Sequence, residues 1–198
     1  LSTLPNFVVM APSDEAELVK MINTSTEIND RPSAFRYPRG TGVGSVLPST
    51  NEKLEIGKSQ IIQEGKKLAL LNFGARLNET LKASDSLRKK GLNITIVDAR
   101  FAKPLDENLI WQLATTHEAI MTIEEGSIGG FGSHVIDFLL KKGLMDTNLK
   151  FRSMTLPDIF IDQDTPDNMY KIANLDSNSI EEKVLDVLNS NIVLQKQK

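Results

Sequence analysis

Cysteine is absent from this 198-residue chain, and histidine occurs only twice. Without cysteine the chain can form no disulfide, no thiolate metal site and no cysteine nucleophile. The two histidines, His117 and His134, lie apart in the sequence and have no partner at the spacing of metal ligands. A single histidine is more often a surface or satisfied core residue than a ligand. The sequence therefore gives no indication of a metal site.

Long hydrophobic runs are also missing. No apolar stretch approaches the roughly 20 residues that cross a bilayer, so we expect no membrane span.

The first residues, LSTLPNFVVM, contain neither an initiator methionine nor the basic region and apolar block of a signal peptide. We expect the chain to be a fragment or processed piece of a longer protein.

The charge balance argues against another class of partner. The formal net charge is −3, whereas nucleic-acid binding proteins and binders of anionic membranes need an excess of lysine and arginine. At 40% hydrophobic and 25% charged residues, the composition is that of an ordinary globular protein. The length suits one large domain, or one domain and part of another.

Residues 1–44 are predicted to form a strand, a helix and a second strand. The strands are expected at residues 7–10 (FVVM) and 33–38 (SAFRYP), and Ser13 is the predicted N-cap of the helix between them. Two short strands and one helix bury too little apolar surface to fold alone. We therefore interpret it as the end of a domain whose main part lies upstream. Residues 45–56 are predicted to be a linker.

Residues 57–190 show regular alternation of apolar strands and amphipathic helices. Thr165 and Pro166 predict the start of one late helix, and Ser179 with Glu182 a capping box at the start of the last. The predicted fold class is α/β, with a mostly parallel sheet flanked by helices on both faces. Residues 191–198 are predicted to be a flexible tail. The strands are expected near 58–63, 67–73, 93–98, 119–124 and 150–155, and the earlier helices at 76–90, 105–116 and 131–142.

A glycine-rich turn in EEGSIGGFGSHV, residues 124–135, has two interpretations. Backbone amides at the start of the following helix can cradle a phosphate, but the spacing is that of neither a dinucleotide fingerprint nor a P-loop. A tight strand-to-helix turn is the simpler interpretation. Glu124 and Glu125 could likewise form an acid–base pair, or could be solvated or bound to amides of the turn.

Three arginines lie at or near the ends of predicted strands. Arg36 and Arg39 lie at the end of the second strand, where open α/β sheets bind ligands, and arginine suits bidentate recognition of phosphate. Their spacing across Pro38 places the two side chains on different faces, so one can be structural while the other faces a crevice. Arg100 leaves a later strand. It is expected either to pair with a nearby carboxylate or to face the preceding domain.

Several motifs together resemble one family. MAPSDEAEL, PSAFRYPRGTG, LLNFGA, VDARFAKPLDENLI, TIEEGSIGGFGSHV and LPDIFIDQDTP follow the order and spacing of the C-terminal third of the 1-deoxy-D-xylulose-5-phosphate synthases, which are transketolase-like thiamine diphosphate enzymes. The resemblance covers residues 4–190. RYPRG followed by RFxKPLD is its most specific part.

The resemblance implies that residues 1–44 end a pyrimidine-binding domain and that residues 57–190 form a transketolase C-terminal domain. It implies a transferase that condenses pyruvate with D-glyceraldehyde 3-phosphate, with loss of CO2, for isoprenoid, thiamine and pyridoxal phosphate synthesis. The whole enzyme would be a homodimer that uses thiamine diphosphate and Mg²⁺. Its catalytic, cofactor-binding and metal-binding residues are expected upstream of this chain. Its location would be a plastid-type organelle or the bacterial cytoplasm.

One site residue carries over from the family. Arg39 matches the arginine that contacts the phosphate of glyceraldehyde 3-phosphate, while Arg36 is the less favoured substrate contact and is expected to brace its strand. Two alternatives stay open at this point. The chain could be a non-catalytic dimerisation or interaction domain, or a transketolase-type relative that uses another acceptor.

Overall fold

The computed structural model of the protein describes residues 1–195. The N-terminal segment contains β1 (Val8–Met10), α1 (Glu15–Ser25) and β2 (Ser33–Phe35), as the sequence predicts. β1 and β2 pair in parallel, and the short strand β6 (Phe101–Lys103) pairs antiparallel with the other edge of β1. β6 was not expected, because three residues make no hydrophobic period and the strand exists only through pairing with β1. It ties the N-terminal segment to the rest of the chain.

The predicted N-cap of α1 was wrong by one residue. Asp14, not Ser13, caps the helix, because its carboxylate accepts a hydrogen bond of 2.8 Å from the amide of Glu17. The hydroxyl of Ser13 instead donates to Asp98, far away in the sequence. The Ser13 hydroxyl is directed at this distant carboxylate, and the Asp14 carboxylate takes the capping position.

The larger sheet is mostly parallel, as predicted. Its strands lie in the order β3-β5-β4-β7-β8, and the pairs β4–β5, β4–β7 and β7–β8 are parallel, whereas the edge strand β3 pairs antiparallel with β5. The central strands β4 and β7 are buried along their whole length, as expected for a sheet covered on both faces. The bounds are Gln60–Gln63 for β3, Leu68–Phe73 for β4, Thr95–Asp98 for β5, Ala119–Glu124 for β7 and Lys150–Met154 for β8.

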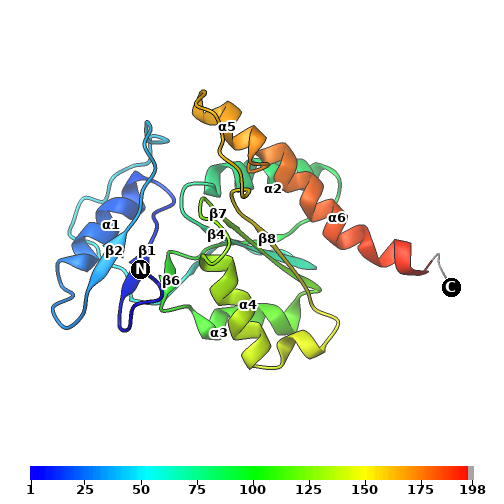
Figure 1. Ribbon diagram of the computed structural model, residues 1–198, viewed down its shortest axis with the longest axis horizontal. Helices are drawn as coiled ribbons and strands as arrows, with labels where there is room; N and C mark the ends of the chain where they lie inside the picture. Colours follow the sequence, from blue (N-terminus) through cyan, green and yellow to red (C-terminus); the bar gives the residue numbers. More distant parts are fainter. Residues whose placement is uncertain (196–198) are drawn as a thin grey trace.

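Helices cover both faces of this sheet (Figure 1). α2 (Leu77–Lys89) and α6 (Ser177–Gln195) lie on one face, and α3 (Glu107–Thr116) and α4 (Phe131–Lys141) lie on the other. Each face has its own apolar core: Leu70, Leu87 and Ile180 belong to the first, and Leu71, Ile110 and Val135 to the second. The remaining helical elements are a 3-10 turn, η1 (Leu144–Asp146), and α5 (Pro166–Ile172).

The two late helices begin differently from each other. α5 begins at Pro166 with Thr165 as its N-cap, as predicted. α6 begins two residues before the expected capping box, because Asp176 accepts a hydrogen bond of 3.2 Å from the amide of Ser179. The capping-box prediction was therefore wrong. α6 reaches Gln195, and residues 196–198 of the predicted flexible tail lie outside the described residues.

Candidate functional site

The N-terminal segment meets the larger sheet where Arg36 and Glu125 face each other. Arg36 follows β2 and Glu125 follows β7. Arg36 Nη1 donates a hydrogen bond of 3.1 Å to the backbone carbonyl of Glu125 and lies 3.6 Å from Oε2 of its carboxylate. The backbone amide of Arg36 also donates to the carbonyl of Met10, so this arginine is fixed at both its main chain and its side chain.

Glu125 is the centre of a four-residue cluster with Arg36, Arg76 and Tyr170, called here the Glu125 cluster. Its side chain is 5% exposed, and its Oε1 lies 3.1 Å from Arg76 Nε and 2.5 Å from the Tyr170 hydroxyl. The Arg76 guanidinium stacks 3.4 Å from the centre of the Tyr170 ring. Burial, followed by the adjacent Glu125 carboxylate, raises the pKa of Tyr170 to about 12, so its hydroxyl stays protonated and donates.

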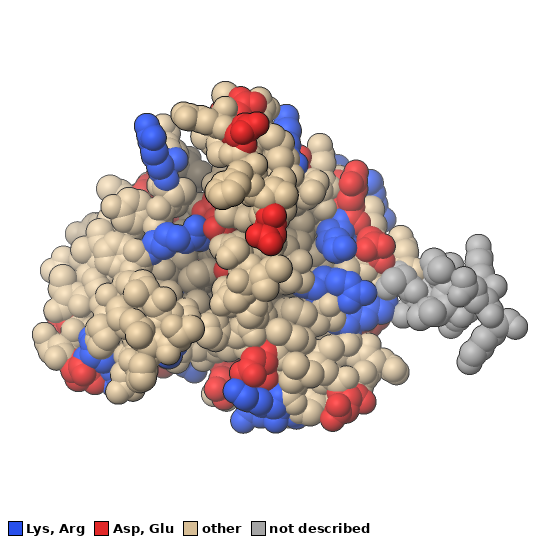
Figure 2. Space-filling view, in the orientation of Figure 1, with Lys and Arg blue, Asp and Glu red and all other residues tan. Residues whose placement is uncertain are grey.

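Sequence reasoning missed Arg76 and Tyr170. Arg76 precedes α2, and Tyr170 lies in α5, which joins the cluster only because the chain folds back over the carboxyl ends of β4 and β7. The partners of Glu125 come from three distant parts of the sequence, so no local spacing could have indicated them. Charged side chains of both signs lie around the hollow between the N-terminal segment and the α5 region (Figure 2).

Glu124 has a different role from its neighbour. The residue is 3% exposed, and its carboxylate accepts hydrogen bonds of 3.0 and 2.9 Å from the amides of Phe131 and Gly132. The amides that begin α4 therefore bind a carboxylate of the chain itself, which favours the tight-turn interpretation over a phosphate cradle. Glu124 and Glu125 do not form an acid–base pair with each other, since each is engaged by other partners.

A second connection between the segments contains Arg100. Its Nε lies 2.8 Å from Oε2 of Glu17 in α1, and its Nη2 donates to Oε1 of the same carboxylate at 2.9 Å. Both expectations for Arg100 are therefore met, because it pairs with a carboxylate and that carboxylate belongs to the preceding segment. Next to this pair, Ser13 donates a 2.6 Å hydrogen bond to Asp98 at the end of β5.

Arg39 lies three residues beyond Arg36, in a loop without helix or strand that follows β2. Its side chain is exposed. Within residues 1–195, no hydrogen bond or ion pair engages its guanidinium, in contrast to Arg36, Arg76 and Arg100. The structure therefore leaves the Arg39 head accessible to an anionic ligand.

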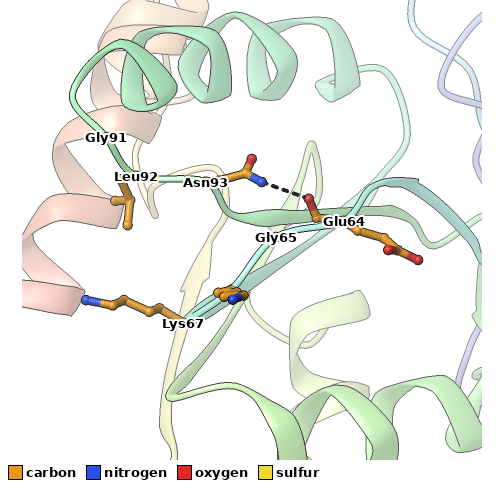
Figure 3. Close-up of a pocket in the computed structure, with 7 residues that line it drawn as sticks. Glu64, Gly65, Lys67, Gly91, Leu92 and Asn93 are labelled. Atoms are coloured by element: carbon orange, nitrogen blue, oxygen red, sulfur yellow. Dashed lines mark hydrogen bonds between the residues drawn. The ribbon is translucent and has the colours of Figure 1, made fainter.

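Other predicted or visible features do not form sites. His117 is satisfied by Thr95, whose hydroxyl lies 2.8 Å from Nε2, and burial lowers its pKa. A hollow at the opposite end of β4 is lined by turn residues (Figure 3), with Asn93 donating to the carbonyl of Glu64 at 3.1 Å. The side chains of Glu64 and Lys67 point in opposite directions there, so these two charged groups do not converge on the hollow.

The described part of the chain offers no ready-made metal site. Residues 1–195 contain no group of three or more acidic or histidine side chains that lie close enough to hold an ion. The same residues include no helix both long and apolar enough to span a bilayer. The amides that begin α4, which are suited to a diphosphate, already bind Glu124. These residues therefore do not fit a Mg²⁺–diphosphate group.

Comparison with known proteins identifies the domain. Residues 57–180 match the family model described as "Transketolase, C-terminal domain". The chain belongs to this family. A split-gene transketolase, solved as an inactive β4 tetramer, shares 26% identity with a TM-score of 0.83 over 94% of this chain and 59% of the other. Transketolase from Campylobacter jejuni subsp. jejuni NCTC 11168 shares 16% identity with a TM-score of 0.63, over 93% and 27% of the two chains.

The predicted fold class is thereby confirmed as α/β with a transketolase C-terminal domain. The chain spans 59% of the split-gene transketolase chain and 27% of the Campylobacter transketolase. The assignment of residues 1–44 to a pyrimidine-binding domain, and the bounds of the linker and tail, stay predictions.

Proposed function

We propose that this chain is the C-terminal part of a 1-deoxy-D-xylulose-5-phosphate synthase. The whole enzyme would join a two-carbon unit from pyruvate to D-glyceraldehyde 3-phosphate with loss of CO2. Membership of the transketolase family supports a transferase that depends on thiamine diphosphate. The narrower assignment rests on the RYPRG and RFAKPLD motifs, which contain Arg39 and Arg100.

The accessibility of Arg39 carries the proposal. Of the arginines near the contact between the segments, Arg36, Arg76 and Arg100 each pair with a carboxylate, whereas Arg39 has no such partner within residues 1–195. A guanidinium without an internal carboxylate can bind a phosphate without first breaking an ion pair. In this proposal Arg39 binds the phosphate of the acceptor, and Arg36 acts by fixing the end of β2.

The cofactor belongs to other parts of the enzyme. Thiamine diphosphate with its divalent metal would supply the carbanion chemistry, and the residues that hold them are proposed to lie upstream. The residues of this chain contribute phosphate binding and the packing that orients Arg39. We expect the isolated chain to be inactive.

The test compares Arg39→Ala with wild type in the full-length enzyme, supplied with thiamine diphosphate and Mg²⁺. Loss of one charge-assisted phosphate contact of roughly 1.5–3 kcal/mol predicts about a 10- to 150-fold fall in kcat/KM for glyceraldehyde 3-phosphate. The KM for pyruvate should not change, because pyruvate has no phosphate.

Arg31→Ala is the matched control. Arg31 is an exposed arginine at the other end of β2, where it pairs with Asp30 at 2.6 Å. Its removal should leave the kinetics of both substrates unchanged. If Arg39→Ala also left acceptor kinetics unchanged, the phosphate-site assignment would be overturned. A panel of aldehyde acceptors distinguishes this enzyme from a transketolase-type relative with another acceptor.

Exposed apolar side chains favour a second role in assembly. Phe160 is fully exposed, and Ile159 beside it is 63% exposed, in the loop between β8 and α5. Adjacent exposed apolar side chains of this size are typical of a surface that another subunit covers. The similar split-gene transketolase chain was solved as a tetramer. We propose that this loop packs against a second copy of the chain in a homodimer.

A further inference from the structure

The loop that carries Arg39 has no secondary structure of its own, so its shape depends on contacts at its two ends. Residues 36–45 contain neither helix nor strand. At the first end, Arg36 is held by the carbonyl and carboxylate of Glu125. A loop fixed only at that end would leave Arg39 free to sample many positions, and binding would have to restrict them.

The second end is held by Glu15, in the first turn of α1. Its carboxylate accepts hydrogen bonds from the amides of Val43, Gly44 and Ser45 at 3.1, 2.6 and 3.0 Å. The Ser45 hydroxyl donates to the neighbouring Asp14 at 2.9 Å. Three consecutive amides directed at one carboxylate form an anion-binding concavity, and the chain fills it with its own side chain.

Gly42 allows this close approach. A Cβ atom at this position would lie 2.6 Å from Oε1 of Glu15, so any larger residue would displace the carboxylate from the amides. Backbone amides, beginning with its own, lower the pKa of Glu15, which keeps the group ionised at neutral pH. The geometry therefore needs both an anionic side chain at position 15 and a glycine at position 42.

We propose that Glu15 is a positioning residue for Arg39, which sets the affinity of the enzyme for a phosphate-bearing acceptor without touching that acceptor. This inference rests on the proposed phosphate-binding role of Arg39. Because the Arg36 contact and the Glu15 contact lie on either side of Arg39, they restrict the backbone from which its side chain projects. Preorganisation of this kind lowers the entropic cost of binding.

The experiment uses the full-length enzyme with thiamine diphosphate and Mg²⁺, and compares D-glyceraldehyde 3-phosphate with unphosphorylated D-glyceraldehyde. Glu15→Ala should raise the KM for the phosphorylated acceptor by about 2- to 12-fold, the cost of one newly mobile side chain. Kinetics with D-glyceraldehyde and pyruvate should not change. Gly42→Ala should reproduce the effect without removing Glu15, because the added Cβ displaces its carboxylate from the amides.

A double-mutant cycle separates positioning from a general structural role. In an Arg39→Ala background, Glu15→Ala should cause no further rise in the acceptor KM, because the group that it positions is gone. Equal losses with both acceptors, or effects that add to those of Arg39→Ala, would overturn the proposal. Glu27→Ala is the control, since Glu27 pairs with Lys53 at 2.9 Å and holds a later part of the linker.

Failure of this inference is distinguishable from failure of the proposed function. If Arg39→Ala has no effect on acceptor kinetics, the phosphate site itself is wrong, and Glu15 has nothing to position. If Arg39→Ala weakens the acceptor while Glu15→Ala and Gly42→Ala do not, the phosphate site is supported and the positioning role is rejected.

Discussion

The hydroxyl of Ser13 donates a 2.6 Å hydrogen bond to the carboxylate of Asp98, and this contact joins the N-terminal segment to the end of β5. Asp98 is 1% exposed. Burial raises its pKa from 3.8 to about 6, and the nearby Glu17 carboxylate acts in the same direction. The Ser13 hydroxyl and the Arg100 side chain and amide oppose the increase but do not cancel it.

This pKa predicts a specific pH dependence of stability. Because the folded-state pKa lies above the unfolded-state value, the folded state binds the proton more tightly, and stability falls as pH rises from about 4 to about 6. A shift of about two units corresponds to about 3 kcal/mol. Asp98→Asn cannot ionise and should lose this part of the dependence. Urea unfolding at several pH values measures it.

Asp85→Asn is the control for that measurement, because Asp85 forms an exposed pair with Arg88. The free energy of unfolding of Asp85→Asn should vary with pH as that of wild type does between pH 4 and 6, within about 0.5 kcal/mol. If the pH dependence of the unfolding free energy were the same for Asp98→Asn and wild type, folding would not raise the pKa of Asp98, and the prediction would be wrong.

Removal of Glu124 should destabilise the domain strongly. Its carboxylate satisfies the amides of Phe131 and Gly132 in a buried site. Hydrogen bonds to a charged group contribute about 1.5–3 kcal/mol each, so loss of both in Glu124→Ala should lower the free energy of unfolding by about 3–6 kcal/mol. Glu124→Gln retains one acceptor oxygen, so its free energy of unfolding should fall by about half as much. Equal stability of all three proteins in urea would contradict the capping role.

Gly132 is predicted to be required for packing of α4 on the sheet. A Cβ atom there would lie 2.6 Å from the Thr122 hydroxyl and 3.2 Å from the Ser153 Cβ. Gly132→Ala should therefore cost about 1–2 kcal/mol, even after the gain in helix propensity. Gly40→Ala is the matched control, because a Cβ at Gly40 meets nothing within 4 Å. Thermal unfolding of the two variants measures the difference.

The regular part of the fold was predictable because its signals are local. The strands β4 and β7 are continuous apolar runs, and α2 places Leu87 on its buried face before Gly91. These patterns depend only on the period of each element and on its end signals. The short strand β6 and the capping by Asp14 and Asp176 depend on pairing partners or on a choice between neighbouring polar residues, and sequence patterns do not decide these.

The candidate site was predictable only in part for the same reason. Arg36, Arg39 and Glu125 could be named because each lies in a recognisable motif next to a predicted strand end. Arg76 and Tyr170 could not, because they reach Glu125 only after α2 and α5 have packed. The loop contacts of Glu15 were missed because they join residues about thirty positions apart.

The loop between β8 and α5 is predicted to contribute to self-association. Phe160 is fully exposed, and the transfer of such a side chain from water into an interface contributes about 1.5–3 kcal/mol. Phe160→Ser in the full-length protein should therefore weaken dimerisation by about 10-fold or more, with little change in the stability of the fold. Sedimentation equilibrium measures the dissociation constant. Trp111→Ser is the control, because Trp111 is 52% exposed on α3. If both variants associate as wild type does, neither side chain contributes to the interface, and Phe160 is merely exposed.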